Sequence, residues 1–200
     1  EENVERITTG DVELTSVKEG KVTFDIRFWA RYPGMGERIR INVDIEAQNN
    51  FYPGYPLVKR GIYYGGRMIS SQYGTEFTNT HYENLKKIYS VFICMNPPKS
   101  RQNTITEYVI CEKHRVGTVC EAKANYDLMT VIMICLGDYK ATDSRLLGML
   151  DVLLSTEYSA EEKKRILSNE FQIQMTKIQE MEVNQMCNYS EGVFDKGWNK

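Results

Sequence analysis

Residues 41–48, INVDIEAQ, alternate strictly between apolar and polar side chains. A period of two places successive side chains on opposite faces, so this segment is predicted to be a β-strand with one apolar and one polar face. The apolar positions are Ile41, Val43, Ile45 and Ala47, and the polar positions are Asn42, Asp44, Glu46 and Gln48. Two interpretations of the polar face are open: the wetted side of an edge strand, or a chemical site.

A second alternating segment precedes the first. Residues 21–32, KVTFDIRFWARY, are predicted to form one strand, and the Pro- and Gly-rich stretch YPGMGE, residues 32–37, then turns the chain back. The two strands are expected to form an antiparallel hairpin. Asp25 would then share a polar patch with Asp44, Glu46 and Gln48.

The remaining chain predicts an α/β domain. A helix is expected over residues 57–73, with Val58, Ile62 and Ile69 on its apolar stripe and with glycines that permit close packing or a kink. Three apolar segments are predicted to be central strands covered on both faces: KKIYSVFICMN, TITEYVICE and MTVIMICLG. Helical patterns follow over residues 143–158, 159–171 and 172–186, the second opened by a capping box of Ser159 and Glu162. Residues 1–140 are therefore expected to form the core, and residues 141–200 a helical extension packed on it.

Composition, charge and missing motifs argue against several classes of function. The chain has 200 residues, of which 42% are hydrophobic and 26% charged, as in soluble globular proteins. A formal charge of −2 disfavours binding of nucleic acid by bulk electrostatics. We find no nucleophile elbow, P-loop or dinucleotide fingerprint, so no nucleotide cofactor is expected. The sequence shows neither a membrane span nor a signal peptide, and the expected location is cytoplasmic.

The five cysteines form no CxxC pair, which favours free thiols over a disulfide framework. Cys111, His114 and Cys120 could be part of a zinc site, but this set lacks a fourth ligand.

The clustered acids also have two explanations. Close carboxylates repel one another unless a cation neutralises them, and oxygen ligands suit Mg²⁺ or Mn²⁺. Alternatively, Arg27, Arg38 and Arg40 pair with the acids as solvated cross-strand ion pairs. Spacing alone leaves both explanations open.

A longer run of text, FDIRFWARYP, INVDIEAQNNFYPGYPLVKRGIYYGGRMIS and IYSVFICMNPP, resembles the PD-(D/E)XK nuclease superfamily, in its transposase-like, recombination-promoting (Rpn-type) branch. The resemblance spans most of residues 21–140. It implies a restriction-endonuclease-like core with a mixed central sheet flanked by helices. It also implies a Mg²⁺-dependent endonuclease that hydrolyses phosphodiesters in double-stranded DNA.

Carried over residue by residue, the resemblance makes Asp25 and Glu46 the metal-binding acids, together with the main-chain carbonyl of Ala47. Gln48 stands where the superfamily usually has Lys, and it would position the attacking water. An amide carries no positive charge, so Lys59 or Arg60 is a candidate for the missing cation. Asp44 is either a more distant acid of the site or an ion-pair partner of Arg27 or Arg40.

The expected DNA contacts come from the helix after the acidic strand. Arg60, Tyr64, Arg67 and Ser71 recur at spacings that put them on one helix face, and Lys59 lies beside them. The near-neutral charge suggests that a homodimer supplies further basic surface. Two rivals remain: a decayed nuclease-fold module that binds DNA or protein without cleavage, and a structural domain whose acids pair with arginines.

Overall fold

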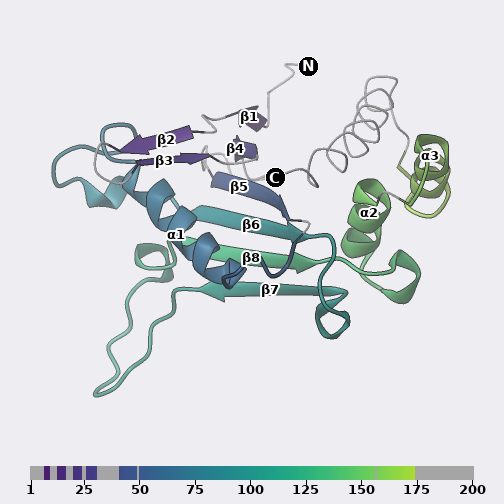
Figure 1. Ribbon diagram of the computed structural model, residues 1–200. Helices are drawn as coiled ribbons and strands as arrows, with labels where there is room; N and C mark the ends of the chain where they lie inside the picture. Colours follow the sequence, from purple (N-terminus) through teal and green to yellow (C-terminus); the bar gives the residue numbers. More distant parts are fainter. Residues whose placement is uncertain are drawn as a thin grey trace, which may run out of the picture. The chain divides into compact units, whose positions relative to one another are not determined.

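The computed structural model describes residues 7–9, 13–16, 20–23, 26–30, 41–48, 50–155 and 157–173 of the chain. Within this part, six strands form one sheet in the order β1-β4-β5-β6-β8-β7 (Figure 1). These strands are β1 (Ile7–Thr9), β4 (Ile26–Ala30), β5 (Ile41–Gln48), β6 (Ile88–Cys94), β7 (Thr104–Val109) and β8 (Met129–Cys135). The predicted α/β class is confirmed.

The sheet is mixed. β4 and β5 pair antiparallel, with Ile26 opposite Ile45 and Arg27 opposite Asp44, so the predicted hairpin pairing is confirmed. β5 and β6 pair parallel. Parallel neighbours need a crossover connection, and here it contains helix α1 (Leu57–Ser70).

The prediction of a single strand over residues 21–32 is wrong. β3 (Gly20–Thr23) pairs with β2 (Glu13–Ser16) in a separate two-stranded sheet, whereas β4 belongs to the six-stranded sheet. Side chains alternate with a period of two in both sheets, so alternation does not show where the chain leaves one sheet and enters the other. The turn predicted at residues 32–37 lies outside the described residues.

β5 lies inside the sheet rather than at its edge. β4 borders it on one side and β6 on the other, which excludes the interpretation of its polar face as one side of an edge strand.

Helix α1 packs on β6 and β8 through two of its glycines (Figure 1). A Cβ at Gly61 would lie 2.5 Å from Cγ1 of Val131, and one at Gly65 would lie 2.6 Å from Sδ of Met129. The glycines therefore permit close packing within one continuous helix, one of the two roles predicted for them.

The apolar stripe predicted for α1 is wrong at Ile62, which is 47% exposed, whereas Ile69 packs against the buried cluster of Met68 and Ile88. The buried face is formed instead by Leu57, Gly61, Gly65, Arg67 and Met68. Glycine carries no hydrophobic side chain, so a pattern of apolar side chains cannot identify a helix face that packs through its backbone.

Of the three strands predicted to be central, two are confirmed and one is wrong. β6 and β8 are mostly buried and neighbour one another inside the sheet. β7 ends the strand order, and all of its residues are exposed. Its sequence TITEYV is half polar rather than apolar throughout, as expected for a strand that is not covered on both faces.

The helical segments after β8 include α2 (Arg145–Leu154) and α3 (Ala160–Asn169). The predicted capping box of α3 is confirmed, with the Ser159 side chain accepting from the Glu162 N–H and the Glu162 carboxylate accepting from the Ser159 N–H. Both helices contribute to one apolar cluster, formed by Tyr139, Val152, Ile166, Leu167 and Phe171. The helix predicted over residues 172–186 lies outside the described residues from residue 174 onward.

Short 3₁₀ helices occur at Tyr82–Asn84, Lys99–Arg101, Lys123–Asn125 and Tyr139–Ala141. The chain divides into two compact units, residues 1–94 with 105–134, and residues 95–104 with 135–200. The predicted boundary at residue 140 and the packing of the extension on the core stay predictions. No helix in the described ranges is both long and apolar enough to cross a membrane.

Candidate site at the end of strand β5

Strand β5 ends at Gln48, one of the two amides on its polar face. The Gln48 side chain is half-buried, and its Oε1 accepts a hydrogen bond of 3.2 Å from Nη1 of Arg60, in the first turn of α1. The Pro-rich bend between them starts the helix at Leu57 after Pro56, a residue that cannot continue a preceding helix. The crossover thus returns a guanidinium to the strand that carries the predicted motif.

Aromatic rings hold the Arg60 side chain in place. Its guanidinium carbon lies 5.0 Å from the ring centroid of Tyr64 and 5.7 Å from that of Phe92. Phe92 is fully buried in β6. An arginine stays protonated in such surroundings, and the ring faces attract it, so a fixed positive charge lies beside Gln48.

The register of β5 and β6 locates the position of Glu46. It pairs with Phe92, the ring that Arg60 contacts, and Gln48 pairs with Cys94. Positions 46 and 48 also share one face of the strand, because alternate residues do. The backbone of β5 at position 46 therefore lies beside the β6 residue whose ring Arg60 contacts.

The outcome for the other predicted acids differs from residue to residue. Asp25 lies outside the described residues, although Ile26, its neighbour in the chain, pairs with Ile45, the neighbour of Glu46. Asp44 is directly opposite Arg27 in the ladder. The two roles considered for Asp44 stay predictions.

The predicted DNA-binding stripe of α1 faces mainly the protein. Arg67 is only 6% exposed, and its Nη1 donates a hydrogen bond of 3.2 Å to the Tyr63 hydroxyl. Arg60 and Tyr64 are half-buried, and only Lys59 of the predicted contacts is exposed. We therefore retain Lys59 and Arg60 as candidate contacts and no longer propose Arg67.

An exposed aromatic group follows strand β5. Sequence reasoning considered Tyr52 and Tyr55, either as residues that line a cleft or as packing residues, and left out Tyr63. Tyr52, Tyr55 and Tyr63 are 70%, 47% and 50% exposed, respectively, so Tyr52 and Tyr55 are not packing residues in the described part of the chain. Lys59 and Tyr63 are four residues apart on α1 and share its exposed face. The spacing of four residues between Lys59 and Tyr63 was visible in the sequence. Arg60 and Tyr64 have the same spacing, so the sequence could not show which of the two pairs is exposed.

The zinc ligands considered from the sequence are also regrouped. Glu112, rather than Cys111, lies together with His114 and Cys120.

In comparisons with known proteins, no family model, curated protein or solved structure matches the chain.

Proposed function

We propose that this protein is a metal-dependent DNA endonuclease with a PD-(D/E)XK-type core. Asp25, Glu46 and the Ala47 carbonyl would hold Mg²⁺, with Mn²⁺ as a substitute, and Gln48 and Arg60 together would replace the usual lysine. The observation that carries the proposal is the Arg60–Gln48 hydrogen bond, because it supplies a cation where the motif otherwise lacks one.

The topology supports this proposal. A hairpin, a helix and a third strand parallel to the second hairpin strand form a mixed sheet, as the resemblance implies. Ile26, which follows Asp25 in the chain, pairs with Ile45, which precedes Glu46.

The donor set fits a hard cation. Two carboxylates and a carbonyl offer only oxygen, which Mg²⁺ prefers. When bound, the ion would lower the pKa of a coordinated water and neutralise charge on the phosphoryl oxygens.

Gln48 and Arg60 would have different roles in the reaction. Since Gln48 Oε1 accepts from Arg60, its amide N–H groups are the part that can donate to a water or a phosphate oxygen. Such an amide orients water but does not remove its proton. Arg60 would place a permanent charge near the scissile phosphate, stabilising the negative charge that develops in the transition state.

The test is nicking of supercoiled plasmid by the full chain in Mg²⁺, in Mn²⁺ and in EDTA. We expect metal-dependent nicking that falls at least about 100-fold in Asp25→Ala and Glu46→Ala. Asp44→Asn is the matched control on the same strand, and it should stay close to the parent. Circular dichroism must show that all variants are folded.

Two other results would reject the endonuclease. Saturable Mg²⁺ binding without cleavage would favour the decayed module, for which the absence of a basic group at position 48 is the supporting observation. No metal binding, with Asp25→Ala less stable than the parent, would favour a structural domain whose acids form ion pairs.

A further inference from the structure

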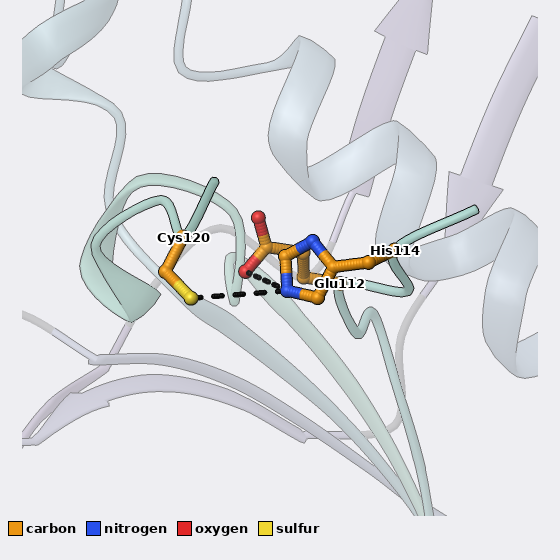
Figure 2. A group of neighbouring side chains, drawn as sticks. All are labelled: Glu112, His114 and Cys120. Carbon is orange, nitrogen blue, oxygen red and sulfur yellow. Dashed lines mark hydrogen bonds and ion pairs between the residues drawn. The ribbon is translucent and has the colours of Figure 1, made fainter. Parts of the chain in front are cut away.

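The long loop between β7 and β8 brings three different metal-ligating side chains together. Glu112, His114 and Cys120 each offer one ligand atom, and these atoms all lie within 4.8 Å of one another (Figure 2). His114 Nε2 is at the centre of the group, 3.8 Å from Sγ of Cys120 and 3.9 Å from Oε2 of Glu112.

These distances are close to those of a tetrahedral zinc site. Zinc bonds of about 2.3 Å to sulfur, 2.05 Å to nitrogen and 2.1 Å to oxygen imply N···S and N···O separations of about 3.6 and 3.4 Å. The two observed separations exceed those values by a few tenths of an ångström. Small side-chain rotations on an exposed loop can close such gaps.

The Glu112 carboxylate is already oriented for the site. Its Oε1 accepts a hydrogen bond of 3.1 Å from the Glu121 N–H, which leaves Oε2 toward His114. Hydrogen bonds that orient a ligand in this way commonly accompany metal sites. Glu121 itself has another role, since its carboxylate accepts from the Ala122 N–H and from Asn125.

The loop has little apolar packing to hold its shape. All residues from 104 to 125 are exposed, and Val116 and Val119 are 97% and 85% exposed. Figure 1 shows this teal segment projecting away from the strands that it joins. A long loop of this kind is usually either functional or disordered, and a metal cross-link is one way to order it.

We infer that Glu112, His114 and Cys120 form a Zn²⁺ site that orders the loop between β7 and β8, with water as the fourth ligand. A thiolate, an imidazole and a carboxylate match the borderline softness of zinc, whereas Mg²⁺ prefers oxygen alone. The site therefore differs in metal and location from the proposed carboxylate site on β5.

Cobalt titration of the reduced, metal-free chain tests the assignment. We expect one equivalent of Co²⁺ to produce thiolate charge-transfer absorption and the d–d bands of a tetrahedral site, both removed by Zn²⁺. Glu112→Gln, His114→Ala and Cys120→Ser should each weaken binding at least about tenfold. Cys111→Ser is the matched control, an exposed thiol on the same loop, and it should bind as the parent does.

Limited trypsin digestion gives a readout that is independent of the spectra, because Lys113 and Arg115 lie within the loop. Zn²⁺ should slow cleavage at these residues several-fold in the parent and in Glu46→Ala, but not in Cys120→Ser. A spectrum that depends on Cys111 rather than Cys120, or no saturable binding, would overturn the assignment. Since Glu46→Ala removes the proposed nuclease and retains this site, the two proposals can fail separately.

Discussion

At the scale of single residues, the proposed function would use the pairing of Arg60 with Gln48 to compensate for an amide at the position where the motif usually has lysine. The positive charge and the motif come from different elements, since Arg60 belongs to α1 and Gln48 to β5. A lysine at position 48 would therefore add a second cation rather than restore a missing one.

The change Gln48→Lys tests this explanation. Two like charges about 4 Å apart repel by about 4 kcal/mol at an effective dielectric constant of 20, so we expect nicking to fall at least about tenfold. The urea midpoint should also fall. The double variant Gln48→Lys, Arg60→Gln exchanges the two groups and should recover most of the loss. A Gln48→Lys protein more active than the parent would show that Arg60 is not the functional cation.

Because of the Asp151 carboxyl, we expect the stability of the second compact unit, residues 95–104 with 135–200, to depend on pH. Burial raises the pKa of its carboxyl, against the opposing effect of the 3.0 Å hydrogen bond from the Tyr139 N–H. The folded state therefore holds the proton more tightly than the unfolded state, and the free energy of unfolding falls as pH rises from the ordinary value of about 3.9 through the raised folded pKa.

The change Asp151→Asn keeps an acceptor for the Tyr139 N–H and removes the charge. In urea denaturation it should be more stable than the parent at pH 7, and the difference should vanish at acidic pH. Asp151→Ala, which lacks the acceptor, should be about 1–3 kcal/mol less stable than Asp151→Asn. Equal destabilisation by both changes at pH 7 would contradict the assigned cost of ionisation.

At the scale of elements, the position of α1 depends on two of its glycines, because a glycine has no side chain to hold the helix away from the sheet. Gly61 and Gly65 allow the helix backbone to approach β6 and β8, and this close approach lets the Arg60 side chain reach both Phe92 and Gln48. Gly66, by contrast, is exposed, and a Cβ added there would have no atom within 4 Å.

Alanine scanning of these glycines separates packing from helix propensity. Gly61→Ala should destabilise the protein by about 1–3 kcal/mol, because Val131 is fully buried and cannot move aside easily. Gly65→Ala should cost less, since its closest neighbour is the flexible Met129 side chain. Gly66→Ala should stabilise by about 0.5–1 kcal/mol, and urea midpoints measure all three. A neutral Gly61→Ala would refute the close packing.

At the scale of the whole molecule, charge limits how tightly the chain can bind DNA. The chain has 25 Lys and Arg against 27 Asp and Glu, and Arg67 is buried, so Lys59 and Arg60 are the retained basic contacts. The logarithm of the association constant for duplex DNA, measured in EDTA, should therefore fall with the logarithm of the salt concentration at a slope of only about −2 to −3. Such a slope corresponds to roughly two or three neutralised phosphates. Fluorescence anisotropy over a salt series measures the slope. A slope steeper than about −6 would indicate a larger basic surface, such as the one a homodimer would supply.

Local patterns in the sequence predicted several elements correctly. Alternation located β5, an apolar run located β6 and β8, and the spacing of Ser159 and Glu162 located the start of α3. These patterns succeed because side-chain period and helix capping depend on residues that are neighbours in the chain.

Which elements meet depended on the tertiary structure. It made β5 an interior strand, left β7 exposed, packed α1 through glycines and brought Arg60 to Gln48. It also selected Glu112 rather than Cys111 as the neighbour of His114 and Cys120. These outcomes depend on strand order, register and loop conformation, which join residues far apart in the chain and leave no trace in a local period.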